Sequence, residues 1–129
     1  MTEPDWLSGE VVIAIHDEQL AIHGGGDGLR DPGMLACALE RPINKWSCEG
    51  ADLAALAAAH AFGLAKNHPF IDGNKRAAFM AMVLFLSQNG LELEAPEADA
   101  LVVVRSMAAS ELSDEEFTSW VRDHVQSKT

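Results

Sequence analysis

The chain has 129 residues, of which 48% are hydrophobic and 22% are charged, and its formal net charge is −11 at pH 7. This length suits one domain with a substantial core, so we expect residues 1–129 to form a single domain. The acidic balance argues against direct nucleic-acid binding, which needs Lys and Arg to neutralise phosphates. No apolar run is long enough to cross a bilayer and no secretory signal is recognisable, so we predict a cytoplasmic protein without membrane contact.

The two cysteines, Cys37 and Cys48, are too few for a disulfide framework. Their spacing does not match that of a metal site either. We therefore expect buried or free thiols in a reducing compartment.

The first predicted helix covers about Gly9 to Ile22, with Ser8 as its N-cap. It must end within residues 23–28 (HGGGDG), because four glycines there favour a flexible loop. A glycine-rich loop can contact phosphate through its backbone, but this one lacks the Lys and Ser of a P-loop and follows no strand. Two interpretations stay open, a nucleotide contact and a mobile loop that faces the substrate, of which we prefer the second.

A second helix is predicted over residues 32–40, because Asp31-Pro32 combines an N-cap with Pro in the first turn. Arg41-Pro42 should stop this helix. Residues 43–50 are then expected to form a polar loop, in which Trp46 is interpreted as a partly buried anchor.

Residues 52–67 form an alanine-rich segment with an apolar stripe at helical spacing, which predicts a third helix. His60 lies on or beside that stripe, so we interpret it as a hydrogen-bonded core residue and not as a ligand. Lys66 suits the negative end of the helix dipole, and it also lies two residues before His68, within reach of a phosphate bound there.

Residues 68–76 (HPFIDGNKR) are followed at once by the ten apolar residues Ala77–Leu86. An apolar run of this kind, closed by Asn89-Gly90, predicts a buried helix that ends in a glycine cap. The polar nonapeptide then lies at the N-terminal end of the helix, where unpaired N–H groups and a positive partial charge attract anions. This position predicts a phosphate site.

The side chains of the nonapeptide fit that chemistry. Histidine is the residue type whose unperturbed pKa lies near neutrality, so His68 can accept a proton from an attacking hydroxyl. Asp72 is the nearest carboxylate that can hold Mg²⁺, since hard cations prefer oxygen ligands. Lys75 and Arg76 add two cations at the helix end where they disfavour the helix dipole, so an anion must offset them. Each residue alone has an ordinary structural explanation, and only their convergence within nine residues indicates a site.

The rest of the chain predicts further helices. Residues 91–94 alternate as a short strand would, and Pro96 then opens another helix. Ser113 to Glu116 is a capping box that starts the last helix, whose apolar face includes Val125. The fold class is therefore all-α, a compact bundle of about six helices around the central buried helix, with little or no sheet. Three histidines without a visible partner pattern are expected at the surface: His16, His23 and His124.

The nonapeptide resembles the signature of the Fic/Doc family, H-x-F-x-[D/E]-[G/A]-N-x-R, and the rest of the chain resembles a compact Doc-type (death-on-curing) domain. Lys75 stands where Fic enzymes that transfer AMP usually carry a small residue, and Doc-type members have Lys there. The resemblance implies the toxin of a type II toxin–antitoxin pair that blocks translation. Such a toxin uses ATP and Mg²⁺ to phosphorylate a Ser or Thr hydroxyl of a protein, with elongation factor Tu as the target of the Doc prototype.

The catalytic residues expected are His68, Asp72, Lys75 and Arg76, with Asp72 as the metal ligand. The residues expected to bind the phosphates of ATP are Gly73, Asn74, Lys75, Arg76 and Lys66. Two alternatives remain, an AMP transferase, which Lys75 disfavours, and a non-catalytic binding module, which the intact motif disfavours.

Many self-inhibited Fic proteins carry an inhibitory helix of the form [S/T]-x-x-x-E-[G/N]. The one Glu-Gly pair here, Glu49-Gly50, has Lys45 where Ser or Thr is required. We therefore expect a separate antitoxin protein as the partner that restrains this chain.

Overall fold

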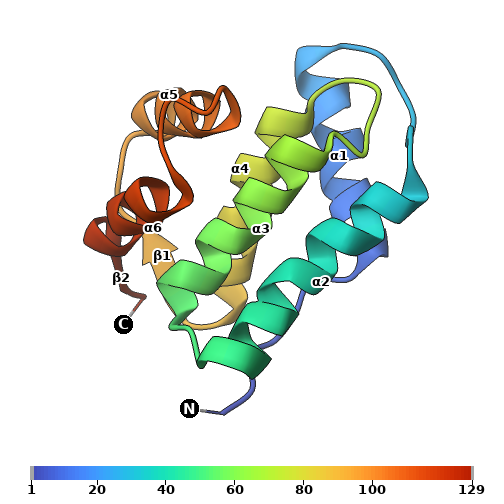
Figure 1. Ribbon diagram of the computed structural model, residues 1–129. Helices are drawn as coiled ribbons and strands as arrows, with labels where there is room; N and C mark the ends of the chain where they lie inside the picture. Colours follow the sequence, from blue (N-terminus) through green and yellow to red (C-terminus); the bar gives the residue numbers. More distant parts are fainter. Residues whose placement is uncertain (1, 129) are drawn as a thin grey trace.

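The computed structural model describes residues 2–128. Within them, six helices and a two-stranded sheet follow one another in the order α1 (Gly9–His23), α2 (Pro32–Glu49), α3 (Leu53–Asn67), α4 (Asn74–Gln88), β1 (Leu91–Leu93), α5 (Glu97–Ala108), α6 (Asp114–Asp123) and β2 (Val125–Ser127) (Figure 1). The predicted all-α class is confirmed.

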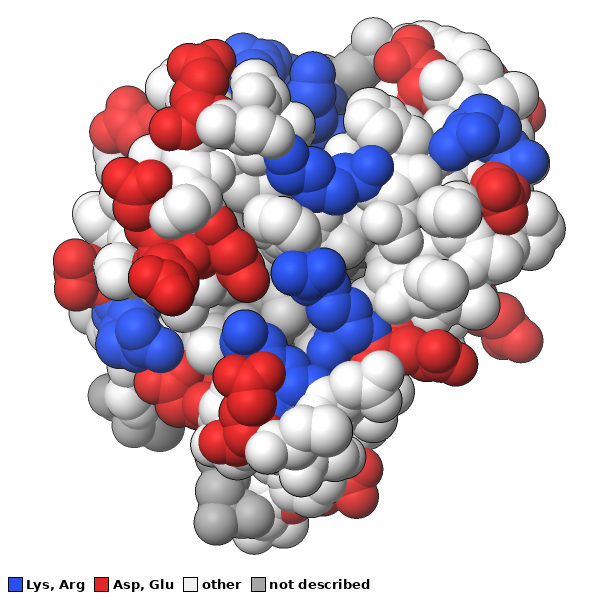
Figure 2. Space-filling view, viewed as in Figure 1, with Lys and Arg blue, Asp and Glu red and all other residues white. Residues whose placement is uncertain are grey.

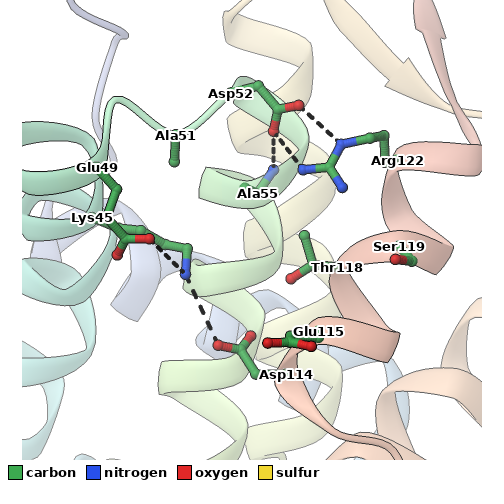
Figure 3. A pocket seen from close by; sticks show the side chains of 10 residues that line it. All are labelled: Lys45, Glu49, Ala51, Asp52, Ala55, Asp114, Glu115, Thr118, Ser119 and Arg122. Atoms are coloured by element: carbon green, nitrogen blue, oxygen red, sulfur yellow. Dashed lines mark hydrogen bonds and ion pairs between the residues drawn. The ribbon is translucent and has the colours of Figure 1, made fainter.

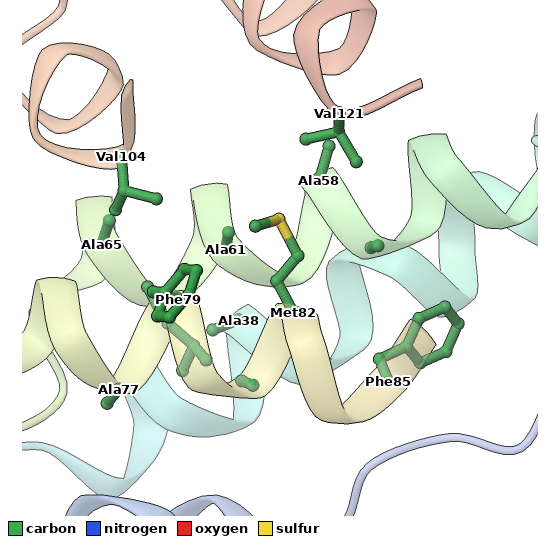
Figure 4. Close-up of a cluster of buried hydrophobic side chains, with 14 of the residues drawn as sticks. Ala38, Ala58, Ala61, Ala65, Ala77, Phe79, Met82, Phe85, Val104 and Val121 are labelled. Atoms are coloured by element: carbon green, nitrogen blue, oxygen red, sulfur yellow. The ribbon is translucent and has the colours of Figure 1, made fainter. Parts of the chain in front are cut away.

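The centre of the bundle is the pair α3 and α4. Helix α3 is rich in alanine and is buried on nearly every side, because small side chains let α2, α4 and α6 approach it closely. A Cβ atom at Gly63 would lie 3.1 Å from the Ala38 Cα of α2. Figure 4 shows larger side chains of α4, such as Met82 and Phe85, beside these alanines. The predicted central helix, Ala77–Leu86, thus shares the middle of the core with α3.

Helix starts agree with the sequence analysis. The Ser8 side chain accepts a hydrogen bond from the Val11 N–H at 3.2 Å, and Asp31 accepts one from Met34 at 3.1 Å. At the start of α6, Ser113 and Glu116 form the predicted capping box. Among the described residues, no helix is long and apolar enough to cross a membrane.

The predicted end of α2 is wrong, because the helix continues through Pro42 to Glu49. Proline inside a helix removes one backbone hydrogen bond and costs about 3 kcal/mol or more. Tertiary packing offsets that cost, since Pro42 is buried and Trp46 packs edge-on against Trp6 with ring centroids 6.2 Å apart. Trp46 is therefore an anchor, as expected, but it lies on a helix and not in a loop. Both cysteines are free and exposed on the same helix.

The C-terminal prediction needs a second correction. Helix α6 ends at Asp123, and Val125 belongs to β2 instead of the helix. Strand β2 pairs antiparallel with β1, with Leu93 opposite Val125. The alternation at residues 91–94 predicted β1, but the partner strand has only three residues and no alternation long enough to recognise.

His60 is a core residue, as predicted. Its side chain is 1% exposed, its Nδ1 donates to the Leu56 carbonyl at 2.8 Å, and its ring lies against Phe85 with centroids 4.4 Å apart. Burial lowers the pKa of His60 to about 4, because the core disfavours the charged imidazolium.

This shift predicts a pH-dependent stability. An unfolded His60 takes up a proton near pH 6.5 and the folded one only near pH 4, so the unfolded state binds more protons between these values. The free energy of unfolding should therefore be highest above pH 6.5 and fall toward pH 4, by up to about 1.4 kcal/mol per pH unit. Urea unfolding across this range should give a flatter profile of unfolding free energy against pH for His60→Leu than for wild type. An unchanged slope in His60→Leu would contradict this assignment.

Candidate active site

The loop between α3 and α4 is a tight elbow with a left-handed residue at each end. His68 ends α3 with φ 48° and ψ 56°, and Gly73 precedes α4 with φ 77° and ψ 17°. Left-handed backbone is easy for glycine but costs of order 1–3 kcal/mol for another residue, so the surroundings of His68 must hold it in place.

Phe70 and Asn74 close the elbow from inside. Phe70 is buried, and both its backbone groups pair with the Asn74 side chain: Phe70 N–H donates to Oδ1 at 2.9 Å and Nδ2 donates to the Phe70 carbonyl at 3.0 Å. The Asn74 side chain is thus committed to the loop, which leaves only its backbone amide for the predicted phosphate contact. Ile71, in contrast, is 60% exposed.

His16 also supports the elbow, so the prediction that it lies at the surface is wrong. Its side chain is 1% exposed, and its ring stacks on Phe70 with centroids 3.8 Å apart. Its Nε2 donates to the Asp72 carbonyl at 2.7 Å. The spacing of Val12, His16 and Gln19, which form the buried face of α1, is the signal that could have placed this histidine inside.

The segment 24–31, which we name the strap, runs beside the elbow (Figure 1). Arg30 N–H and Asp31 N–H donate to the Pro69 carbonyl at 2.7 and 3.0 Å, and Ile71 N–H donates to the Gly28 carbonyl at 3.1 Å. The Arg30 Nε also donates to the His68 carbonyl at 2.9 Å. The glycine-rich loop that the sequence predicts to be mobile is therefore held against residues 68–72.

Two backbone N–H groups orient the Asp72 carboxylate. Gly73 N–H donates to Oδ1 at 2.8 Å, and Gly26 N–H, from the strap, donates to Oδ2 at 3.3 Å. The carboxylate is exposed to solvent. It therefore presents oxygen lone pairs in a direction that the backbone fixes.

A cavity of about 430 Å³ opens at the N-terminal end of α4, within the usual size range of ligand pockets. It is lined by His23, Gly24, His68, Ile71, Asp72, Gly73, Asn74, Lys75, Arg76, Leu101 and Arg105. All the predicted site residues line it except Lys66, whose Nζ contacts Ser110 Oγ and lies over the Phe62 ring at 5.7 Å. Arg105 and Leu101, from α5, had no signal in the sequence, because a single arginine on an amphipathic helix is indistinguishable from a surface residue.

The N-terminus of α4 has no side-chain cap among the described residues, and its first turn contains no acidic side chain. The backbone N–H groups of Asn74, Lys75 and Arg76 are therefore left for water or a ligand. Arg76 Nη1 donates to His23 Nε2 at 3.2 Å, so this histidine, which the sequence analysis placed at the surface, lies within the cavity lining.

The cations of this cavity are not neutralised. Within residues 2–128, none of Lys75, Arg76 and Arg105 forms an ion pair, and Asp72 is the one carboxylate in the lining. Three cations around an uncapped helix terminus favour a ligand with several negative charges.

A second cavity, of about 480 Å³ between the end of α2 and α6, shows the opposite arrangement (Figure 3). Lys45 lies 4.0 Å from both Glu49 and Asp114, and Arg122 donates two hydrogen bonds to Asp52. The hydrogen bond from Arg122 lowers the pKa of the Asp52 carboxyl. Figure 2, viewed from the same side as Figure 1, shows that blue side chains toward the edges of this face lie next to red ones. Lys45 and Arg122 therefore already have carboxylate partners.

Comparison with known proteins identifies the family of this chain. The model described as the Fic/DOC family matches residues 6–86, and this chain belongs to that family. Two relatives are of the Doc type. The protein kinase doc of Escherichia phage P1 is 34% identical over 99 residues, 75% of this chain and 79% of the relative. The toxin Doc of Mycolicibacterium smegmatis is 42% identical over 76 residues, 56% of this chain and 57% of the relative.

Removing the buried hydrogen bond of His16 should loosen the elbow. His16→Phe keeps a ring against Phe70 but leaves the Asp72 carbonyl without its donor, which should lower the free energy of unfolding by about 1–3 kcal/mol. Hydrogen exchange of the amides at residues 70–73 should become faster. His124→Phe is the matched control, because His124 stacks on Trp120 at 4.2 Å and bonds to the Trp120 carbonyl at the end of α6. Equal exchange rates at residues 70–73 in wild type and His16→Phe would refute this role.

Proposed function

We propose that this Doc-like protein transfers the γ-phosphate of ATP to a Ser or Thr hydroxyl of a protein. The observation that carries the proposal is Lys75 at the uncapped start of α4, in one cavity with His68 and Asp72. The name of one relative, protein kinase doc, supports the same reaction. Phosphoryl transfer needs mainly positioning and charge stabilisation, and this cavity offers groups for both.

His68 is the proposed general base. Its side chain is exposed at the cavity, and the bond from Arg30 to its carbonyl holds its backbone. The imidazole accepts the proton of the target hydroxyl while the hydroxyl oxygen attacks the γ-phosphorus. The bond from the γ-phosphorus to the bridging oxygen breaks, ADP leaves with the electron pair, and the proton stays on His68.

The phosphate ligands proposed are the amides of Gly73, Asn74 and Lys75 with the Lys75 and Arg76 side chains. They lie at the end of α4 where the helix dipole also favours negative charge. Arg105 adds a cation from the facing element α5. Lys66 is not included, because its side chain turns toward Ser110.

Asp72 is the proposed ligand of Mg²⁺. Residues 2–128 contain no group of three or more His, Cys, Asp or Glu that could hold a metal ion by themselves. Mg²⁺ is usually bound through one or two carboxylates together with phosphates and water, so an exposed Asp72 beside a nucleotide fits it. Bound there, Mg²⁺ would supply neutralisation of charge on the phosphate oxygens.

The proposed biological role is that of the toxin in a toxin–antitoxin pair, acting in the cytoplasm. By its resemblance to Doc, the target is elongation factor Tu and the result is a block of translation. The absence of the inhibitory motif from the sequence supports a separate antitoxin as the restraining partner.

Labelled ATP tests the base and the reaction together. Wild-type protein incubated with Mg²⁺, elongation factor Tu and ATP labelled at the γ or α position should transfer the γ label alone. His68→Ala should lose at least about 10²-fold of that rate, the low end for general base catalysis. Circular dichroism should show that the variant stays folded, and His124→Ala should keep the activity. Transfer of the α label by wild type would instead establish an AMP transferase, and retained activity in His68→Ala would exclude this histidine as the base.

Lys75 should decide which phosphate is attacked. In an AMP transferase the β- and γ-phosphates occupy the anion site at the helix start, and a lysine side chain there competes with them for space. Lys75→Gly should therefore begin to transfer the α label and lose γ-label transfer. Lys45→Ala, which removes a lysine from the cavity at α6, should transfer the γ label alone, as wild type does. A Lys75→Gly protein that transfers the γ label alone would show that this residue does not set the orientation of ATP.

A further inference from the structure

The strap has a feature that its contacts with the elbow backbone do not explain: it also reaches the side chain of Asp72. Gly26 N–H donates to Asp72 Oδ2 at 3.3 Å, while Oδ1 accepts from Gly73 N–H at 2.8 Å. The Gly26 N–H is thus already used by a hydrogen bond within the protein. This argues against the interpretation of the glycine-rich loop as a phosphate cradle through that N–H.

Gly25 lies beside the same oxygen, where a side chain would overlap it. A Cβ atom built at Gly25 would lie 2.9 Å from Asp72 Oδ2, 3.3 Å from Leu20 Cδ2 and 3.5 Å from Asp72 Cγ. A Cβ atom in a protein structure essentially never lies within 3.0 Å of a non-bonded heavy atom, so a side chain at position 25 would force the Asp72 carboxylate to shift. The absence of a side chain at position 25 is therefore what lets the carboxylate keep its present orientation.

We propose that Gly25 and Gly26 are positioning residues, which orient the Asp72 carboxylate so that one lone-pair direction of each oxygen is left for a divalent cation bound with nucleotide. This inference rests on the proposed function, because it uses Asp72 as the metal ligand. It assigns the strap a role through Asp72 and not through direct contact with ATP.

The elbow backbone cannot move to relieve a side chain at position 25, but the carboxylate can. Ile71 N–H is bonded to the Gly28 carbonyl, and the Asp72 carbonyl accepts from His16, so the backbone on both sides of the Asp72 side chain is held. The carboxylate is the flexible end of the Asp72 side chain, and rotation about the side-chain bonds moves it away from a Cβ atom at position 25. A methyl group at position 25 should therefore turn Asp72 away from its present direction while the fold persists.

The chain offers a matched control in the same strap. Gly25 has φ +124° and Gly28 has φ +112°, so alanine is strained at both positions. A Cβ atom at Gly28 meets only Ile71 Cδ1, at an ordinary 3.5 Å, and does not approach Asp72. Gly28→Ala thus reproduces the backbone strain of Gly25→Ala without the overlap with the carboxylate.

The test measures nucleotide binding by isothermal titration calorimetry, with a non-hydrolysable ATP analogue added either with Mn²⁺ or with EDTA. The ratio of the two dissociation constants gives the contribution of the metal, with no catalytic turnover involved. Wild type and Gly28→Ala should both gain affinity from Mn²⁺. In Gly25→Ala this gain should fall about 10-fold or more, as is typical when a group that orients a metal ligand is disturbed, while affinity in EDTA stays unchanged. In an Asp72→Ala background, Gly25→Ala should cause no further loss of the affinity that Mn²⁺ adds to nucleotide binding.

Each result bears on a separate claim. If Mn²⁺ gives no gain in wild type, Asp72 is not a metal ligand, and both the proposed metal site and this inference are wrong. If wild type and Gly25→Ala gain equally, the proposed function stands and this inference alone is overturned. If Gly25→Ala does not fold while Gly28→Ala folds, the carboxylate does not turn aside to relieve the overlap, and this inference is overturned.

Discussion

The site depends on how Phe70 is held in the core. Its ring is stacked by His16 from α1, and both its backbone groups are bonded to the side chain of Asn74 at the start of α4. Because one residue is fixed from two helices, the six residues of the elbow keep a defined path between α3 and α4. The proposed base, metal ligand and phosphate ligands, from His68 to Arg76, lie within six residues of Phe70, so a change in the core at Phe70 is expected to disturb them.

Charge is distributed in a way that separates the site from the rest of the molecule. The chain carries a net charge of −11, and three cations outside the cavity, Arg41, Lys45 and Arg122, form ion pairs with carboxylates. At the start of α4, cations gather where the helix dipole disfavours them and no ion pair offsets them. An arrangement that lowers the stability of the free protein is typical of a binding site, because the ligand supplies the missing charge.

The sequence predicted the fold class, the helix starts and the residues of the elbow, since these depend on local patterns: caps, an apolar run and a compact motif. The sequence-based predictions failed where contacts between residues far apart in the chain determine the structure. Pro42 should have ended α2, but its burial and the packing of Trp46 against Trp6 offset the lost backbone hydrogen bond. His16 had no visible partner, because its partner is a carbonyl 56 residues away. Arg105 joins the cavity only through the packing of α5, which no local pattern reveals.

The two walls of the cavity belong to different parts of the chain. The strap, the elbow and α4 up to residue 86 lie within the region that the Fic/DOC family model matches, whereas Leu101 and Arg105 lie beyond it on α5. Arg105 is exposed on α5, so replacing its side chain changes the charge of the cavity without touching the proposed base or metal ligand. The charge of the ligand that the cavity accepts can therefore be altered from a helix that lies outside the region matched by the family model.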